Sequence, residues 1–260
     1  MKVLFLGNSH TYYNDMPHIF ENICKEREKN VEVHMQAHPG VTYEWHLSEN
    51  TELRYAMMYG HYDYIIMQQA SHIPCPSKEE THRDAKTIIA MAKDNGVTPI
   101  QTMPWAEKDY PEHQATMYDV FCSLHDETGI RLNPVGNVFE DVLSNHPEIN
   151  MYWLDNRHAS AYGSYAAAMC AYATIFGESV QGLSPMSYDT FRVADENWSK
   201  IAEARKACNE DPENFSLREK LTELCKEYIK PVMTEAEARV ELESDKAEIL
   251  QKLVDKYALK

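Results

Sequence analysis

The stretch KVLFLGNSHT, residues 2–11, opens with a short apolar run that breaks at Gly7 and continues into polar residues. An apolar run of this length is typical of a buried strand in a parallel sheet. Gly7 lets the chain bend sharply, so we expect Ser9 in the loop directly after the strand. Ligand sites of open α/β sheets lie at the carboxyl ends of the strands, which places Ser9 at the edge where a function is expected.

Further strand-like runs follow, and helical sequence separates most of them. This alternation predicts an α/β fold with a doubly wound sheet of five parallel strands. The later strands are expected over residues 31–36, 62–67, 98–102 and 130–133, and the helices over residues 17–27, 78–95, 111–128 and 159–177.

A second polar segment, Asp155-Asn156-Arg157-His158, stands just before the helix rich in small residues. A serine hydroxyl becomes a good nucleophile only when a neighbouring base accepts its proton and a carboxylate orients that base. An aspartate three residues before a histidine can turn back to reach Nδ1 of that histidine. We therefore expect Ser9 to be a nucleophile, His158 its general base and Asp155 the orienting carboxylate.

Other loops at the same edge supply candidate donors for an oxyanion. The backbone amide of Ser9 is one, and the amide of Gly40, after the second strand, is another. A side-chain amide of Gln68 or Gln69, after the third strand, would be the third, and one such donor is worth about 3 kcal/mol in the transition state. His10 and Trp105 are candidate substrate-binding residues.

These segments resemble the SGNH hydrolases, also called the GDSL esterase and lipase superfamily. The resemblance covers about residues 1–180, and within the superfamily it is nearest to bacterial SGNH-type proteins classed as a domain of unknown function. It implies a flavodoxin-like three-layer α/β/α sandwich and ester hydrolysis through an acyl-enzyme on Ser9, with His158 and Asp155 completing the triad. By analogy, the substrate would be a short acyl ester, such as an acetyl group on a carbohydrate or another small molecule.

The chain departs from the family pattern at two blocks. Asn8 stands where the family usually has an aspartate, which keeps a turn-forming side chain and loses its charge. The third block usually contains an asparagine donor, whereas this chain reads Gln68-Gln69-Ala70-Ser71-His72. Either glutamine, or His72, could therefore provide the third oxyanion donor.

Charge and composition argue against some classes of binding partner and some locations. A formal net charge of -16 argues against nucleic acid, because phosphates would be repelled. No apolar run approaches the roughly 20 residues that a membrane span needs, and the N-terminal run is too short for a signal-peptide core. The six cysteines are scattered and form no Cys-x-x-Cys pair, so we expect reduced thiols and a cytoplasmic protein.

The end of the chain has a different character. Residues 1–190 are predicted to form the SGNH-type domain, and residues 191–260 an acidic helical extension with apolar residues at helical spacing. We expect this extension to pack on the domain, and the alternative is an arm for homo-oligomers. The helix over residues 245–257 could instead close the first domain.

Two rival functions remain open at this point. Gly7-Asn8-Ser9-His10 partly matches an element of metallophosphoesterases, but the chain has no Asp-x-His or His-Glu-x-x-His element. We therefore expect neither a metal nor a cofactor. The second rival is a non-catalytic binding module on the same scaffold. The altered third block, which lacks the usual asparagine donor, is compatible with this alternative. An α/β-hydrolase is excluded because no Gly-x-Ser-x-Gly occurs.

Overall fold

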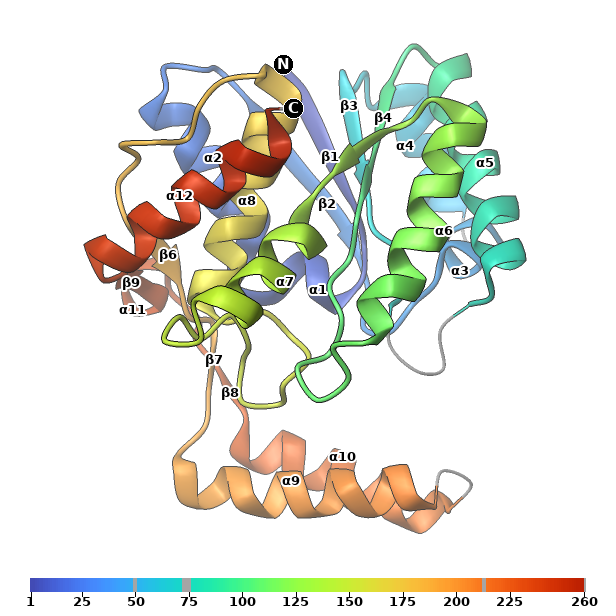
Figure 1. Cartoon of the computed structure of the whole chain (residues 1–260). Helices are drawn as coiled ribbons and strands as arrows, with labels where there is room; N and C mark the ends of the chain where they lie inside the picture. Colours follow the sequence, from blue (N-terminus) through green and yellow to red (C-terminus); the bar gives the residue numbers. More distant parts are fainter. Residues whose placement is uncertain (49–50, 72–75, 212–213, 260) are drawn as a thin grey trace.

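The computed structural model describes residues 1–48, 51–71, 76–211 and 214–259. Its centre is a five-stranded parallel sheet with the strand order β2-β1-β3-β4-β5 (Figure 1). This confirms the predicted α/β fold and its five-stranded parallel sheet. The strands are β1 (Lys2–Gly7), β2 (Glu32–Ala37), β3 (Tyr64–Met67), β4 (Thr98–Thr102) and β5 (Arg131–Asn133).

The strand order reverses next to β1. The chain passes from β1 to β2 at one edge of the sheet and then crosses to β3 on the other side of β1. At such a switch point the connections leave in opposite directions, and a crevice forms outside the carboxyl ends of the two strands. Ser9 is therefore positioned by the topology as well as by the bend at Gly7.

Alternate residues of β1 enter two separate cores, as expected for a strand covered on both faces. Val3 and Phe5 pack with one set of helices, and Leu4 and Leu6 with the other, giving a three-layer sandwich (Figure 1). The first set is α2 (Met16–Glu26), α7 (Val135–Asn145), α8 (Ala161–Phe176) and α12 (Ser244–Ala258). The second is α3 (Tyr43–Ser48), α4 (Thr51–Tyr59), α5 (Lys78–Asp94) and α6 (His113–Thr128).

Three of the eight helices just named were not expected from the sequence: α3, α4 and α7. Helix α7 begins beside Pro134 and contains Gly136, two residue types that usually signal a turn. The structure shows what Gly136 does there, since a Cβ atom at this position would lie 2.1 Å from the carbonyl oxygen of Pro104. The glycine allows α7 to approach the loop after β4, a requirement that only the packed chain reveals.

Beyond α8 the chain makes two short antiparallel ribbons. Strand β6 (Met186–Tyr188) pairs with β9 (Arg239–Glu241), and β7 (Phe191–Arg192) pairs with β8 (Lys230–Pro231). Between β7 and β8, helices α9 (Asp195–Glu210) and α10 (Phe215–Tyr228) form a hairpin that extends below the sandwich in Figure 1. We call these two helices the α9–α10 hairpin. The short helix α11 (Glu235–Ala238) precedes β9.

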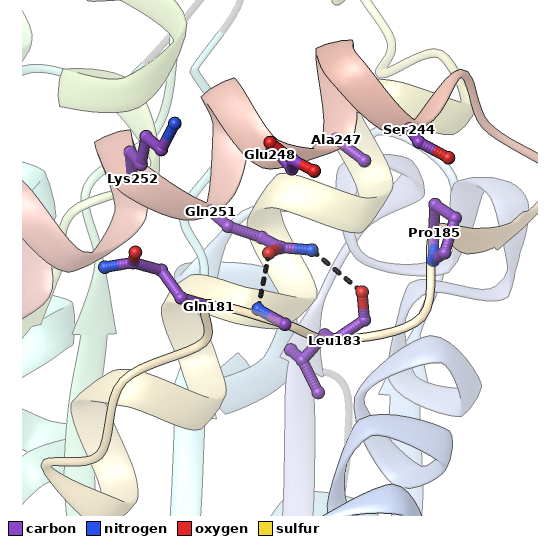
Figure 2. A pocket seen from close by; sticks show the side chains of 9 residues that line it. Gln181, Leu183, Pro185, Ser244, Ala247, Glu248, Gln251 and Lys252 are labelled. Atoms are coloured by element: carbon purple, nitrogen blue, oxygen red, sulfur yellow. Dashed lines mark hydrogen bonds between the residues drawn. The ribbon is translucent and has the colours of Figure 1, made fainter.

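Helix α12 returns to the sandwich and joins the first core. Its Gln251 side chain donates to the Tyr165 hydroxyl at 3.0 Å and to the Leu183 carbonyl at 2.9 Å, and accepts from the Gly182 amide at 2.8 Å. Figure 2 shows how Gln251 holds the loop at residues 181–185 against the helix. The end of the chain thus packs on the sandwich, while a domain boundary at residue 190 stays a prediction.

Among the residues that the structure describes, no helix combines the length and apolar character needed to cross a membrane.

Candidate active site

Ser9 begins a one-turn helix, α1 (Ser9–Tyr12), directly after β1. A Cβ atom at Gly7 would lie 2.4 Å from Thr11 Oγ1 and 3.1 Å from the Gln68 carbonyl oxygen, so only glycine allows this tight approach. The Asn8 side chain caps the turn by accepting from the His10 amide at 3.1 Å, and its Nδ2 donates to the Val41 carbonyl at 3.2 Å. An aspartate could make the first contact but not the second.

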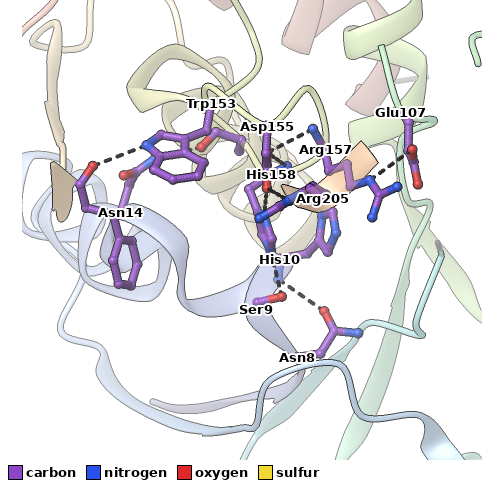
Figure 3. A network of polar contacts seen from close by, with 12 residues as sticks. Asn8, Ser9, His10, Asn14, Glu107, Trp153, Asp155, Arg157, His158 and Arg205 are labelled. Carbon is purple, nitrogen blue, oxygen red and sulfur yellow. Dashed lines mark hydrogen bonds and ion pairs between the residues drawn. The ribbon is translucent and has the colours of Figure 1, made fainter. Parts of the chain in front are cut away.

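The structure brings Ser9 together with the segment at residues 155–158. His158 Nε2 lies 2.8 Å from Ser9 Oγ, and His158 Nδ1 lies 2.6 Å from Asp155 Oδ2 (Figure 3). The other carboxylate oxygen, Asp155 Oδ1, accepts from the backbone amides of Arg157 at 3.0 Å and His158 at 2.9 Å. The segment therefore turns back on itself, as its three-residue spacing suggested.

Asp155 is held as a carboxylate although its side chain is only 1% exposed. Burial by itself would raise the pKa of Asp155. The hydrogen bonds from His158 and the charges of His158 and Arg205 outweigh burial, and they hold this pKa well below its usual range. An ionised Asp155 can orient the His158 ring and stabilise its protonated form.

The His158 ring is also fixed by stacking. Tyr13 lies almost parallel to it, with ring centroids 3.9 Å apart and an interplanar angle of 12°. His10 stacks with the same imidazole at 5.0 Å. Burial raises the pKa of Tyr13 and of Tyr12. Sequence reasoning missed this role of Tyr13, because no spacing signal links it to a residue 145 positions later in the chain.

The loop after β4 supports the same segment. The Trp105 indole donates to the Arg157 carbonyl at 2.9 Å, and Arg157 Nε lies 3.1 Å from Glu107 Oε2. Trp105 also stacks on Phe139 at 4.5 Å and contacts His10 at 4.7 Å. Trp105 is 2% exposed and His10 is 5% exposed. Both side chains are therefore buried beside the triad, and their direct contact with substrate stays a prediction.

Gly40, the second expected oxyanion donor, lies in the loop after β2 with φ of +69°, a conformation that favours glycine. The next residue, Val41, is the one tied to Asn8, so this loop is attached to the turn that carries Ser9. His72, the alternative third donor, lies outside the described residues.

The two glutamines after β3 have different surroundings. Gln68 accepts from Thr11 Oγ1 at 2.8 Å and donates through Nε2 to the Gln69 carbonyl at 3.0 Å. Gln69 Oε1 accepts from the backbone amides of Tyr43 at 2.9 Å and Ala70 at 3.0 Å. Within the described part of the chain, Gln69 Nε2 is buried and makes no hydrogen bond, so both of its protons are available. Gln69 is thus the one of the pair with an unused donor atom, and which glutamine serves an oxyanion stays a prediction.

Over residues 1–48, 51–71, 76–211 and 214–259, no group of three or more His, Cys, Asp or Glu side chains is arranged to hold a metal ion.

Solved structures with the same fold match this chain over about two thirds of its length. A protein from Slackia heliotrinireducens that is assigned to the SGNH hydrolases matches with a TM-score of 0.59 and 24% identity, over 67% of this chain and 98% of that one. A DUF4886 family protein from Bacteroides uniformis matches with a TM-score of 0.56 and 17% identity, over 71% and 89%. An acetyl xylan esterase matches with a TM-score of 0.56 and 14% identity, over 68% and 100%.

Identities below 25% establish the fold and not the reaction. Neither a protein-family model nor a curated protein sequence matches the chain. The resemblance noted from the sequence is confirmed at the level of the fold, and the chemistry depends on the residues described above.

Proposed function

Because the chain has the fold of the SGNH hydrolases, we propose that it is a serine esterase that works through an acyl-enzyme on Ser9. The observation that carries this proposal is the continuous hydrogen-bonded path from Ser9 Oγ through His158 to Asp155. A buried carboxylate, an imidazole and a hydroxyl in this order form the arrangement that activates a serine.

In the proposed reaction, His158 Nε2 accepts the Ser9 proton while Oγ attacks the ester carbonyl. The imidazolium that forms is stabilised by Asp155, and it returns its proton to the departing alcohol. Water, activated by the same imidazole, then hydrolyses the acyl-enzyme and regenerates Ser9.

The negative charge on the tetrahedral intermediate needs donors that are already in place. We assign this role to the backbone amides of Ser9 and Gly40 and to Gln69 Nε2. The assignment of Gln69 over Gln68 is supported by its unused donor atom. Its Oε1 is fixed by two backbone amides, which would hold the Nε2 group in one orientation.

We infer the substrate class by analogy with solved structures that have the same fold. An acetyl xylan esterase shares the fold, which favours an acetyl or other short acyl ester on a carbohydrate or a small molecule.

A series of p-nitrophenyl esters tests the proposal. We expect wild-type protein to hydrolyse the C2 to C4 esters and to react covalently with an organophosphonate probe. The variants Ser9→Ala and His158→Ala should lose at least about 10³-fold in kcat, while Ser199→Ala, which removes an exposed hydroxyl on α9, should behave as wild type. Wild-type protein that is inert both to every short ester and to the probe would instead support a non-catalytic binding module.

A further inference from the structure

We propose that Arg205 is a positioning residue of the Ser9 site and that the α9–α10 hairpin is therefore a working part of it. Arg205 Nη1 lies 3.1 Å from Asp155 Oδ2, the same oxygen that His158 Nδ1 approaches at 2.6 Å (Figure 3). The two ionised side chains are 22% and 1% exposed, respectively. The inference rests on the proposed function, because it concerns the same triad.

The guanidinium is surrounded by residues of both hairpin helices. It lies over the Trp198 ring on α9, with its central carbon 5.7 Å from the centroid. Burial raises the pKa of the Cys225 thiol on α10, and the charge of Arg205 opposes that rise. Trp198 in turn packs edge-on against Trp153 at 5.1 Å, and the Trp153 indole donates to the Phe191 carbonyl at 3.2 Å. Both helices of the hairpin therefore lie around the guanidinium that contacts Asp155.

This contact restrains the carboxylate of the triad. An arginine is always charged and its planar group has fixed donor directions, so it limits the rotation of the Asp155 carboxylate. With the backbone amides of Arg157 and His158 on Oδ1, the cation leaves Oδ2 facing Nδ1 of His158.

The contact joins the hairpin to the triad carboxylate. It therefore couples the order of α9 and α10 to the geometry of the triad.

The test compares Arg205→Gln, Arg205→Lys and the matched control Lys206→Gln. Lys206 is the next residue on α9, is 78% exposed and contacts Glu210 at 3.9 Å. We expect Arg205→Gln to lower kcat for p-nitrophenyl acetate roughly 10- to 100-fold with KM nearly unchanged, the rate equivalent of one charge-assisted hydrogen bond. The control Lys206→Gln should match wild type in both kcat and KM.

Arg205→Lys separates charge from geometry. It keeps the positive charge but loses the planar fork, so we expect a kcat reduced at least about threefold with KM nearly unchanged.

The experiments distinguish a failure of the proposed function from a failure of the role of Arg205. Wild-type protein inert to esters and to the phosphonate probe would defeat the proposed function itself. Active wild type, together with an Arg205→Gln variant of unchanged kcat, would overturn only the role of Arg205. If Arg205→Gln does not fold, as judged by thermal unfolding, the Arg205→Lys variant decides, and an unchanged kcat there would count against the inference.

Discussion

Replacing Asp155 with asparagine is the sharpest test of the proposed triad, because the change is almost isosteric and its consequence can be worked out from four contacts. Oδ1 accepts from two backbone amides, and Oδ2 accepts from His158 Nδ1 and from Arg205. All four partners are donors, so an amide NH2 at either position faces two donors and cannot satisfy them. The carboxylate is the only group of this shape that fits.

The amide should settle with its NH2 group toward His158. The opposite orientation would leave two buried backbone amides without acceptors, whereas the partly exposed Arg205 can donate to water instead. His158 must then present a lone pair at Nδ1 and carry its proton on Nε2, 2.8 Å from Ser9 Oγ. In that tautomer the ring donates to the serine and cannot accept its proton.

We therefore expect Asp155→Asn to lower kcat about 10⁴-fold, as wrong-tautomer variants of such triads do. This corresponds to about 5.4 kcal/mol of transition-state stabilisation. The assay is hydrolysis of p-nitrophenyl acetate, with thermal unfolding to show that the variant is folded and Asp94→Asn, an exposed change at the end of α5, as the control. A folded Asp155→Asn variant that keeps more than a tenth of wild-type kcat would refute the assigned role.

Two further predictions concern the surroundings of Ser9. Gln69→Glu keeps an acceptor for the Tyr43 and Ala70 amides but removes the Nε2 donor, so kcat should fall at least about 10²-fold, and unchanged turnover of p-nitrophenyl acetate would exclude Gln69 from the oxyanion site. His46, which is 3% exposed and donates through Nε2 to the Gly7 carbonyl at 2.9 Å, has its pKa lowered by burial. As pH falls below the unfolded value of about 6.5, the unfolded chain takes up the proton first, so the free energy of unfolding should decrease there. Urea denaturation at pH 7.5 and 5.5 should show this decrease in wild type and a smaller one in His46→Gln; equal decreases would contradict the assignment.

Much of the fold was readable from the sequence because its signals are local. The run at residues 2–6 is apolar at every position except Lys2, as a strand covered on both faces requires, and β1 forms there. The strand over residues 98–102 has the predicted bounds, and the helices over residues 78–95 and 111–128 differ from the structure by one or two residues. Such differences at helix ends are ordinary.

The elements that were missed depend on contacts made elsewhere in the chain. Helix α7 contains a glycine because the loop after β4 leaves no room for a side chain. Trp105 was expected in a loop at the active edge, and only the structure shows that it is buried against Phe139 and His10. Neither fact has a counterpart in the residues nearby in sequence.

For the site itself, the sequence alone determined which chemistry to look for. Gly7 and Ser9 after an apolar strand, and Asp155 three residues before His158, are short-range patterns whose geometry follows from covalent connectivity and one turn of chain. Only the tertiary structure decided which side chains surround them: Tyr13 stacked on the imidazole, Gln69 with an unused donor, and Arg205 on the carboxylate. These side chains are separated along the sequence by tens of residues or more from the groups they surround. Burial of apolar surface in the sandwich and the hairpin brings them into contact, and local spacing does not.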